Sequence, residues 1–538
     1  MIEISNDLLR LIIMGKTLRK YLIPFPFLFC IYPLLTLIAF NISEMPLEDG
    51  FRALIISLIL TLTIFTLLAI LIKNPIKSSI LTTLILVLIF SYGHTYDILY
   101  GITVMGNTLG RHRYLGFVYL VFLVIASWFI LNSRHRMSTL PIFLNFITLS
   151  LLIIPLYQIM DYQLERSQAY REIEKDVYIE SGVSRSQDQP APDVYYIITD
   201  GYPRNDFIFQ YMDMDNSYFL DYLDAKRFFV AECSQSNYTT TSGSMAGTLN
   251  MNYLLNNDGE RSGALPPDPK LDAMIHSNEV QAIFSNLDYT IVTFDNGYPW
   301  LNWETSDVRF DLPFELSDLD FFTETINDFE ILAIKTTALR LFLDLSILPE
   351  LEQYNIPITD WDIPGVHRRN KIFFMLDTLP EIPKTIPSPK FVYFHIVFPH
   401  PPYIMDADGE LLNGEPADEL AAYADQITFI NSRLINIIDT LLEESDPEPI
   451  IVIQSDHGAS IDYEGLEIDK ANRLGILNAF HLPGIDINEL YSTISPVNTF
   501  RLIFDRYFNG QYGLLPDNSI VGKEGPFTTI SCSLDPKQ

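Results

Sequence analysis

The chain has 538 residues, enough for two or three domains of ordinary size. Aromatic residues make up 13% of it, which excludes a disordered chain, and a net charge of −32 excludes a protein that binds nucleic acid through a basic surface. The three cysteines, Cys30, Cys233 and Cys532, are too few for a disulfide-rich scaffold or a cysteine-built zinc site.

Charge is divided unequally along the chain. Residues 1–160 contain 11 Lys and Arg against 6 Asp and Glu, a local charge of +5, so the rest of the chain carries −37. The apolar residues and the acids are therefore in different parts of the sequence. Most of the acidic excess after residue 160 is interpreted as solvated surface.

Five long apolar runs occupy the N-terminal third. They lie at 21–40, 53–72, 79–100, 115–132 and 138–160. Each is close to the roughly 20 residues that an α-helix needs to cross a bilayer. We therefore predict an α-helical membrane domain of five spans over residues 1–160.

Basic residues in the short loops predict the orientation of these spans. With five spans, most of these residues lie on the same side of the membrane: Arg10, Lys16, Arg19, Lys20, Lys73, Lys77, Arg134 and Arg136. Arg111 and Arg113 run against this pattern. The balance places the N-terminus in the cytoplasm of a multi-pass cell-membrane protein and everything after residue 160 outside it. In that compartment Cys233 and Cys532 could pair, which the sequence leaves open.

Residues 161–192 are polar and predict a juxtamembrane helix followed by an extended linker. From 193 to 538, short β-rich runs alternate with helical patterns. The clearest strands are 194–199, 289–294, 390–397 and 450–455, and the clearest helix is 417–445. This alternation is typical of an extracytoplasmic α/β domain with a mainly parallel sheet covered by helices.

Several predicted strands end in residues suited to chemistry. Asp200 follows the first, His395 and His400 belong to FVYFHIVFPH, and Asp456-His457-Gly458 follows the last. Ligands of open α/β sheets bind at the carboxyl ends of the strands, where a carboxylate and an imidazole can hold one divalent cation. The alternative for Asp456-His457-Gly458 is a plain turn with a chance histidine.

The run SNYTTTSGSMAGTLNM (236–251) offers several hydroxyl groups ahead of a helical pattern. A helix N-cap accounts for one of them. Another is a candidate nucleophile, because a cation that stabilises the alkoxide makes a hydroxyl reactive.

The order Asp…Thr…H-x4-H…DHG…His resembles the sulfatase/alkaline-phosphatase superfamily. The closest likeness is to its membrane-anchored branch, the lipoteichoic acid synthases and lipid A phosphoethanolamine transferases, which also place about five spans before the catalytic domain. The resemblance implies that four residues bind the metal: Asp200, Thr241, Asp456 and His457. It also implies that Thr241 is the nucleophile, with Thr239 and Thr240 left as alternatives.

The resemblance gives other residues a role towards the substrate. His395 and His400 resemble a catalytic pair that holds phosphate oxygens, protonates a leaving group or binds a second metal. His481 takes the place of a last active-site histidine, with an ordinary strand or loop histidine as the alternative. Trp300 and Arg309 are further substrate-binding candidates, against a surface-packed tryptophan and a solvated arginine.

The function that this resemblance implies is a metal-dependent transferase. It would move a phosphoryl-linked head group from a membrane phospholipid to an envelope glycan or lipid through a phosphothreonine. The cofactor would be one divalent ion (Mn, Zn or Mg), with a second left open. One alternative is a hydrolase of the same fold, acting as a phosphodiesterase, phosphatase or sulfuric ester hydrolase, and another is a non-enzymatic sensor or scaffold. The residues after Cys233 lack the Pro and Arg of the C/S-x-P-x-R motif of sulfatases, which favours phosphoryl chemistry.

Overall fold

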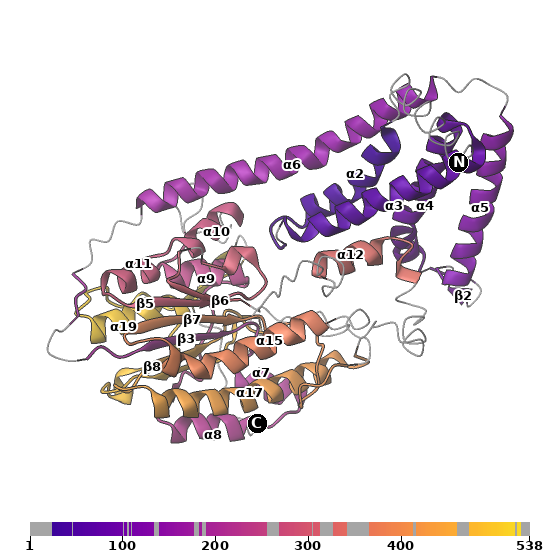
Figure 1. Ribbon diagram of the computed structural model, residues 1–538. Helices are drawn as coiled ribbons and strands as arrows, with labels where there is room; N and C mark the ends of the chain where they lie inside the picture. Colours follow the sequence, from indigo (N-terminus) through magenta and orange to yellow (C-terminus); the bar gives the residue numbers. More distant parts are fainter. Residues whose placement is uncertain are drawn as a thin grey trace. The chain divides into compact units, whose positions relative to one another are not determined.

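The computed structural model forms two compact units (Figure 1). The first contains residues 1–163 and 316–362, and the second contains residues 164–315 and 363–538. The structure describes residues 24–45, 47–100, 102–104, 107–108, 110–133, 139–176, 182–185, 190–254, 268–303, 305–311, 327–341, 365–412, 416–459, 473–521 and 524–528.

The first unit is helical. Within the described ranges, four of its helices are long and apolar enough to cross a membrane: α3 (Asp49–Ile72), α4 (Pro75–Tyr100), α5 (His112–Asn132) and α6 (Leu140–Asp176). A shorter apolar helix, α2 (Phe25–Phe40), precedes them, and a small hairpin of β1 (Thr103–Val104) and β2 (Asn107–Thr108) joins α4 to α5. Four of the five predicted spans are thus confirmed as membrane-length helices. The first predicted span, 21–40, stays a prediction, because the described helix α2 is shorter than the other four and residues 1–23 lie outside the described residues.

A segment from the predicted catalytic part of the sequence belongs to this helical unit. Helix α12 (Asp328–Thr336) contacts α3 and α4. Phe329 and Ala333 are buried against Leu34 and Ile38 of α2. This packing was not expected from the sequence, because nothing in residues 316–362 marks them as distinct from the domain around them.

Ion pairs fix this segment to the ends of two membrane helices. Arg52 near the start of α3 donates through Nε, 2.5 Å, and through Nη2 to the carboxylate of Glu330, and each of the two side chains is 10% exposed. Arg340 pairs with Asp97 near the end of α4 at 2.5 Å and lies over the ring of Tyr96. Within the helical unit, the start of α3 and the end of α4 therefore lie next to residues 327–341.

The second unit is built on a seven-stranded sheet in the order β4-β9-β8-β3-β7-β5-β6. Its strands are β3 (Val194–Thr199), β4 (Phe229–Val230), β5 (Thr290–Phe294), β6 (Val308–Phe310), β7 (Lys390–Ile396), β8 (Ile450–Gln454) and β9 (Asn478–His481). Strands β8, β3, β7, β5 and β6 run parallel, whereas β9 is antiparallel to β8 and β4 is antiparallel to β9. The predicted α/β domain with a mainly parallel sheet is confirmed. A separate hairpin is formed by β10 (Asn518–Val521) and β11 (Glu524–Thr528).

Helices cover both faces of the sheet (Figure 1). One face packs against α7 (Asn205–Met212), α8 (Ser217–Ala225), α15 (Val366–Thr378), α16 (Ile382–Thr385) and α17 (Glu419–Glu444). The other packs against α9 (Thr241–Leu249), α10 (Asp268–His276), α11 (Glu279–Asn286) and α19 (Thr499–Tyr507). Short 3-10 helices are η1 (Pro299–Leu301), η3 (Leu379–Glu381), η4 (Ile487–Glu489) and η5 (Pro496–Asn498).

Strand β3 shows why the sequence folds in this way. Tyr195 and Ile197 enter the core on the α17 side, and Tyr196 and Ile198 enter the core on the α9 side. A strand buried on both faces needs apolar residues at every position, which is what VYYIIT provides.

A buried ion pair aligns the central strands at the end opposite the catalytic candidates. Lys390 of β7 places Nζ 2.5 Å from Oδ2 of Asp193, and both side chains are at most 2% exposed. The backbone N–H of Lys390 donates to Oδ1 of the same carboxylate, and the N–H of Ile450 donates to the carbonyl oxygen of Asp193. One aspartate therefore connects the starts of β3, β7 and β8.

Replacing Lys390 with Met should destabilise the second unit by about 3–5 kcal/mol, because it leaves a buried carboxylate without its cation. The midpoint of urea unfolding, followed by tryptophan fluorescence of the full chain in detergent, measures the effect. Lys384→Met is the matched control, since Lys384 is half exposed in its pair with Glu444 and should change stability by no more than about 1 kcal/mol. Equal midpoints for the two variants would contradict the role of the buried pair.

Candidate active site

The loops after β3, β7 and β8 meet at one edge of the sheet. Ile198 of β3 is paired with His395 of β7 and with Gln454 of β8. Asp200 and Asp456 each lie two residues beyond this level, so the parallel register brings them side by side. The predicted meeting of strand-end residues therefore follows from the direction of the strands.

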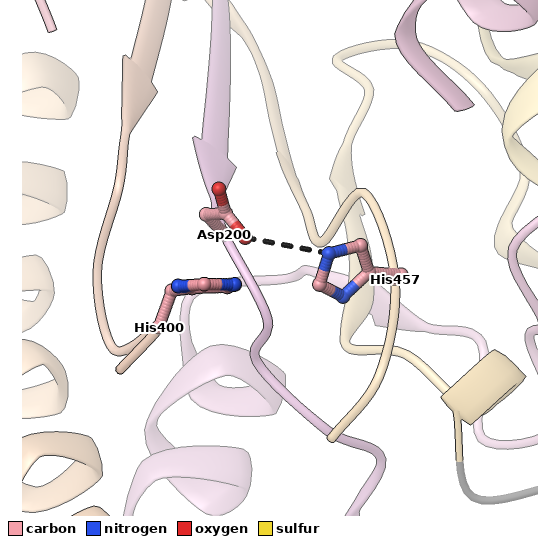
Figure 2. A group of neighbouring side chains, drawn as sticks. All are labelled: Asp200, His400 and His457. Atoms are coloured by element: carbon pink, nitrogen blue, oxygen red, sulfur yellow. Dashed lines mark ion pairs between the residues drawn. The ribbon is translucent and has the colours of Figure 1, made fainter. Parts of the chain in front are cut away.

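The side chains at this edge form a compact group (Figure 2). Nε2 of His457 lies 3.6 Å from Oδ1 of Asp200 and 3.5 Å from Oδ2 of Asp456. Nε2 of His395 lies 3.8 Å from Oδ2 of Asp200. Figure 2 shows His400 and His457 on two sides of Asp200, each ring directed towards the carboxylate.

Two sets of three residues offer ligand atoms within 4.8 Å of one another. One set is Asp200, His400 and His457, and the other is Asp200, His395 and Asp456. Asp200 belongs to both sets. All of these residues are buried except His400, which is partly exposed.

Several atoms of this group are buried with no hydrogen bond from the described residues. They are Oδ1 of Asp200, Oδ2 of Asp456 and Nε2 of His395. Buried polar atoms nearly always have a partner, so orphans of this kind need one. Carboxylate oxygens and imidazole nitrogens are ligands of Zn²⁺ and Mn²⁺, and the group therefore fits a divalent cation.

Hydrogen bonds connect the loop after β3 to Asp456 and to helix α17. The N–H of Gly201, at a φ of +72°, donates to Oδ1 of Asp456 at 3.0 Å. The hydroxyl of Tyr423 on α17 donates to the carbonyl oxygen of Gly201. Only glycine adopts this φ without strain. Gly201 therefore allows the turn that follows Asp200, and its N–H orients the carboxylate of Asp456.

Burial raises the pKa of Asp200, but the imidazoles of His400, His395 and His457 lower it more. The net pKa lies well below that of an ordinary aspartate. Asp200 is therefore ionised at neutral pH and able to ligate a cation.

His457 presents a lone pair to the same centre. Nδ1 of His457 lies 2.9 Å from the carbonyl oxygen of Gly458, which requires an N–H at Nδ1 and leaves the lone pair of the neutral ring on Nε2. Burial lowers the pKa of His457, Asp456 raises it and Arg473 lowers it, with a net decrease. The ring is therefore neutral at neutral pH and able to ligate a cation.

Thr241 is the first residue of α9. Among residues 239–241, it is the threonine whose hydroxyl contacts this group. Its Oγ1 lies 3.3 Å from Nε2 of His457. Thr240 is the N-cap, and its hydroxyl accepts a hydrogen bond from the N–H of Gly243. The positive end of the helix dipole lies at Thr241 and favours negative charge there.

Arg473 is a member of this group that the sequence analysis missed. Its Nη2 lies 3.2 Å from Nε2 of His457, and its Nε donates to the carbonyl oxygen of Thr239 at 3.0 Å. No motif contains Arg473, and 15 residues separate it from His457. A search for basic residues after the DHG motif would have been the only available signal.

Three predicted substrate residues lie outside the cluster. His481 is level with Ile451 near the start of β8, where it contacts Glu448 at 3.0 Å and the carbonyl oxygen of Lys226. Because β9 is antiparallel to β8, His481, the last residue of β9, lies at the opposite end of the sheet from the candidate active site. The arrangement is that of an ordinary strand histidine, the alternative stated above.

Arg309 and Trp300 also lie apart from the cluster. Arg309 is on the edge strand β6, two strands from β7, and pairs with Asp311 at 2.8 Å and Asp295 at 3.4 Å. Trp300 is in η1 and packs edge-on against Tyr298, which is the arrangement of a surface-packed tryptophan.

No protein-family model and no curated protein matches the chain. Solved structures do match its fold. The C-terminal periplasmic domain of EptC from Escherichia coli, in complex with Zn, is 11% identical with a TM-score of 0.42, and the match covers 66% of this chain and 97% of that one. Lipooligosaccharide phosphoethanolamine transferase A from Neisseria meningitidis, an integral membrane protein, is 12% identical with a TM-score of 0.39, covering 89% and 96%.

The lipoteichoic acid synthase LtaP from Listeria monocytogenes is a third match, 14% identical with a TM-score of 0.35, covering 64% of this chain and 80% of that one. These matches include phosphoethanolamine transferases and a lipoteichoic acid synthase, the enzymes that the sequence resembles.

Replacing Asp456 with Asn should weaken the binding of Zn²⁺ or Mn²⁺ by at least about tenfold, because it removes an anionic oxygen from the site. Isothermal titration of the purified chain measures this affinity. Asp408→Asn is the control, since Asp408 is exposed and outside both ligand sets. An affinity that D456N leaves unchanged, or that D408N lowers equally, would show that the cation binds elsewhere.

Proposed function

We propose that the chain is a membrane-anchored, metal-dependent phosphotransferase of the sulfatase/alkaline-phosphatase type. It moves a phosphoryl-linked head group from a membrane phospholipid to an envelope acceptor, a glycan or a lipid. The observation that carries the proposal is the position of Thr241. Its hydroxyl lies at the start of a helix and 3.3 Å from a histidine nitrogen whose neighbours include two buried carboxylates.

Asp200, Asp456 and His457 are the residues that would hold the cation, and Thr241 would complete the set. A divalent cation bound there lowers the pKa of the threonine hydroxyl and neutralises charge on the phosphoryl oxygens. Thr241 is partly exposed, so a substrate can reach its hydroxyl from solvent.

In the first half-reaction, Oγ1 of Thr241 loses its proton to solvent and attacks the phosphorus of the donor in line. The bond from phosphorus to the diacylglycerol oxygen breaks as the bond to Oγ1 forms. The N-terminal amides of α9 favour the anionic product. In the second half-reaction, the acceptor hydroxyl gives its proton to the histidine that protonated the departing oxygen and attacks phosphothreonine. The bond from phosphorus to Oγ1 breaks, and Thr241 regains a proton from solvent.

The departing oxygen needs a proton, and two histidines are placed to supply it. His395 is 1% exposed, whereas His400 is partly exposed and held by a hydrogen bond between its Nδ1 and the carbonyl oxygen of Pro401. We assign the proton transfer to His400, because a substrate in the open part of the site can reach it. His395 then orients the carboxylate of Asp200.

A hydrolase of the same fold is the second candidate. The two overlapping ligand sets that share Asp200 favour it, because two cations can activate water against a phosphodiester. Vesicles with labelled phosphatidylethanolamine or phosphatidylglycerol separate the two functions. Label transferred to a glycan or lipid supports the transferase, and free head group with no transfer supports the hydrolase.

Two observations support an extracytoplasmic catalytic unit. Cys233 is disulfide-bonded while Cys30 is free, and disulfides persist in oxidising compartments. Cys532, the remaining cysteine, lies outside the described residues.

The second observation is the packing of α12 in the helical unit. The sequences on either side of α12, 312–326 and 342–364, are acidic and contain no uninterrupted apolar run long enough to span a membrane. The segment therefore stays on the side of the catalytic residues, and its contacts with Arg52 and Asp97 support the same side for the start of α3 and the end of α4. The same side follows from the positive residues in the loops when the N-terminus is cytoplasmic.

Replacing Thr241 with Ala should abolish covalent labelling of the chain by a labelled phospholipid donor, since no other group of the site supplies the oxygen. Peptide mass spectrometry should find the label on Thr241 of the unchanged protein. Thr240→Ala is the control and should keep the label, while losing about 0.5–2 kcal/mol of stability with the helix cap. Undiminished labelling in T241A would overturn the assignment.

The chain should carry one reactive thiol before reduction and three after it, because Cys30 is free and Cys233 is disulfide-bonded. Maleimide labelling of the denatured protein, read as a mass shift, measures this. Cys30→Ser should remove the label found before reduction. Three reactive thiols without reduction would contradict an oxidising compartment for the catalytic unit.

A further inference from the structure

We infer that residues 327–341 form a lipid-binding segment, which enters the extracytoplasmic leaflet of the membrane and contacts its phospholipids. By sequence the segment belongs to the catalytic part of the chain, and the five predicted spans do not include it. The inference goes beyond the proposed function: it uses the proposed side of the segment and none of the residues of the candidate active site.

The segment contacts α4 below the outer end of the apolar run of α3. Helices α3 and α4 contact each other and are joined by residues 73–74, and the uncharged run of α3 extends from this turn to Ala53. Counted outward from the turn, Ala53 is level with His94 of α4. The N–H of Ala338 donates to the carbonyl oxygen of Ile89 at 2.8 Å. Ile89 precedes His94 by five residues, so this contact lies roughly 7 Å below the end of the apolar run.

A glycine of α4 allows this close contact. A Cβ added to Gly93 would lie 2.2 Å from the carbonyl oxygen of Lys335 and 2.4 Å from the carbonyl carbon of Thr336. Any other residue at this position would therefore push the backbone of the segment away from α4. Gly93 also lies one turn beyond Ile89, so no side chain at that position covers the carbonyl oxygen that Ala338 contacts.

The backbone that follows α12 is hydrogen-bonded as a lipid environment requires. The N–H of Ala338 donates to α4, and the N–H of Leu339 donates to Oγ1 of Thr337 at 3.2 Å. The N–H groups of Thr337, Arg340 and Leu341 donate to carbonyl oxygens of the segment itself. In water these amides could bind solvent instead, whereas in hydrocarbon each needs a protein partner. Residues 337–341 can therefore lie at apolar depth with every N–H paired.

Apolar side chains surround most of α12. Phe329 and Ala333 are buried against α2. The other apolar residues of the helix are partly exposed: Ile331, Leu332 and Ile334. Leu339, just after the helix, is 45% exposed. A helix that is apolar on nearly all sides is typical of burial or of contact with lipid, and part of this surface is not buried by protein.

The charges of the segment are those of a membrane–water boundary. Glu330 and Arg340 each form an ion pair with a membrane helix, through Arg52 and Asp97. Lys335 is exposed, and no carboxylate pairs with it among the described residues. A lysine at this depth extends its ammonium group outward, where the phosphates of lipid head groups lie. The partner is therefore a phospholipid, whose acyl chains contact Leu339 and whose phosphate contacts Lys335.

Spin labels in a bilayer test the contact with lipid. Leu339→Cys is labelled with a nitroxide in the Cys30→Ser full chain, without reducing agent, in nanodiscs of phosphatidylethanolamine and phosphatidylglycerol. Power-saturation EPR measures collisions of the label with oxygen, which concentrates in lipid, and with a water-soluble nickel chelate. The L339C label should collide several-fold more often with oxygen and several-fold less often with nickel than a label in water.

Two reference positions have a similar exposure. Ile487 in η4 is 46% exposed and lies between Asp486 and Asn488, so the I487C label should be in water. Ile125 on α5 is 51% exposed, and the I125C label should contact acyl chains. The L339C label should give values between these two.

Nickel collisions at L339C equal to those at I487C would overturn the inference, because Leu339 would then be in water. Few collisions with both reagents would overturn it as well, because protein rather than lipid would then cover Leu339. None of these measurements needs turnover, so a failure of the proposed reaction would leave their outcome unchanged.

A second pair of variants tests how the segment is held. Gly93→Ala should move the segment away from α4 and raise the nickel collisions of the L339C label, since the added Cβ meets backbone atoms. Gly116→Ala on α5 is the matched control, because a Cβ there has nothing within 4 Å, and it should leave the collisions unchanged. Equal collisions in the two variants would contradict the packing of the segment on Gly93.

Discussion

Two buried carboxylate oxygens, Oδ1 of Asp200 and Oδ2 of Asp456, determine how this catalytic unit must be built. Neither accepts a hydrogen bond from the described residues. An ionised oxygen left in this state costs several kcal/mol, and a cation bound between the strand ends would offset that cost. Parallel strands bring the two aspartates level, and the Asp193–Lys390 pair aligns the same strands from the other end. Helix α9 then brings Thr241 to the same point.

The acidity of the chain and its proposed substrate fit together once this cation is considered. A domain with a strong excess of acids repels a phosphodiester. In the proposed site, however, two of these acids, Asp200 and Asp456, would hold a cation, and Arg473 lies next to the same group of residues. Anchoring in the membrane raises the local concentration of lipid donors. The packing of α12 in the helical unit means that the catalytic sequence contributes directly to that anchor.

Most strands and helices of the catalytic part could be predicted from the sequence. The features that were wrong or missed depend on contacts between residues that are distant in the chain. Strand β3 was predicted over 194–199, which are its bounds in the structure, because apolar runs and turn residues are local signals. Helix α17 was predicted over 417–445 and spans Glu419–Glu444, beginning after the capping Asp418. His481 was expected in the site and lies at the far end of the sheet, because sequence does not show that β9 runs antiparallel. Arg473 and α12 were missed because their partners, Thr239 and Arg52, are distant in the chain and no spacing links them.

The central claim is that one divalent cation is bound by residues from the ends of β3 and β8 next to Thr241. The most direct measurement is anomalous X-ray diffraction from crystals of the full chain grown with Zn²⁺, recorded on both sides of the zinc absorption edge. The account predicts a peak about 2.0–2.2 Å from ligand atoms of Asp200, Asp456 and His457, with Oγ1 of Thr241 at its remaining position. A peak only at exposed acids, with none between the two strand ends, would contradict it.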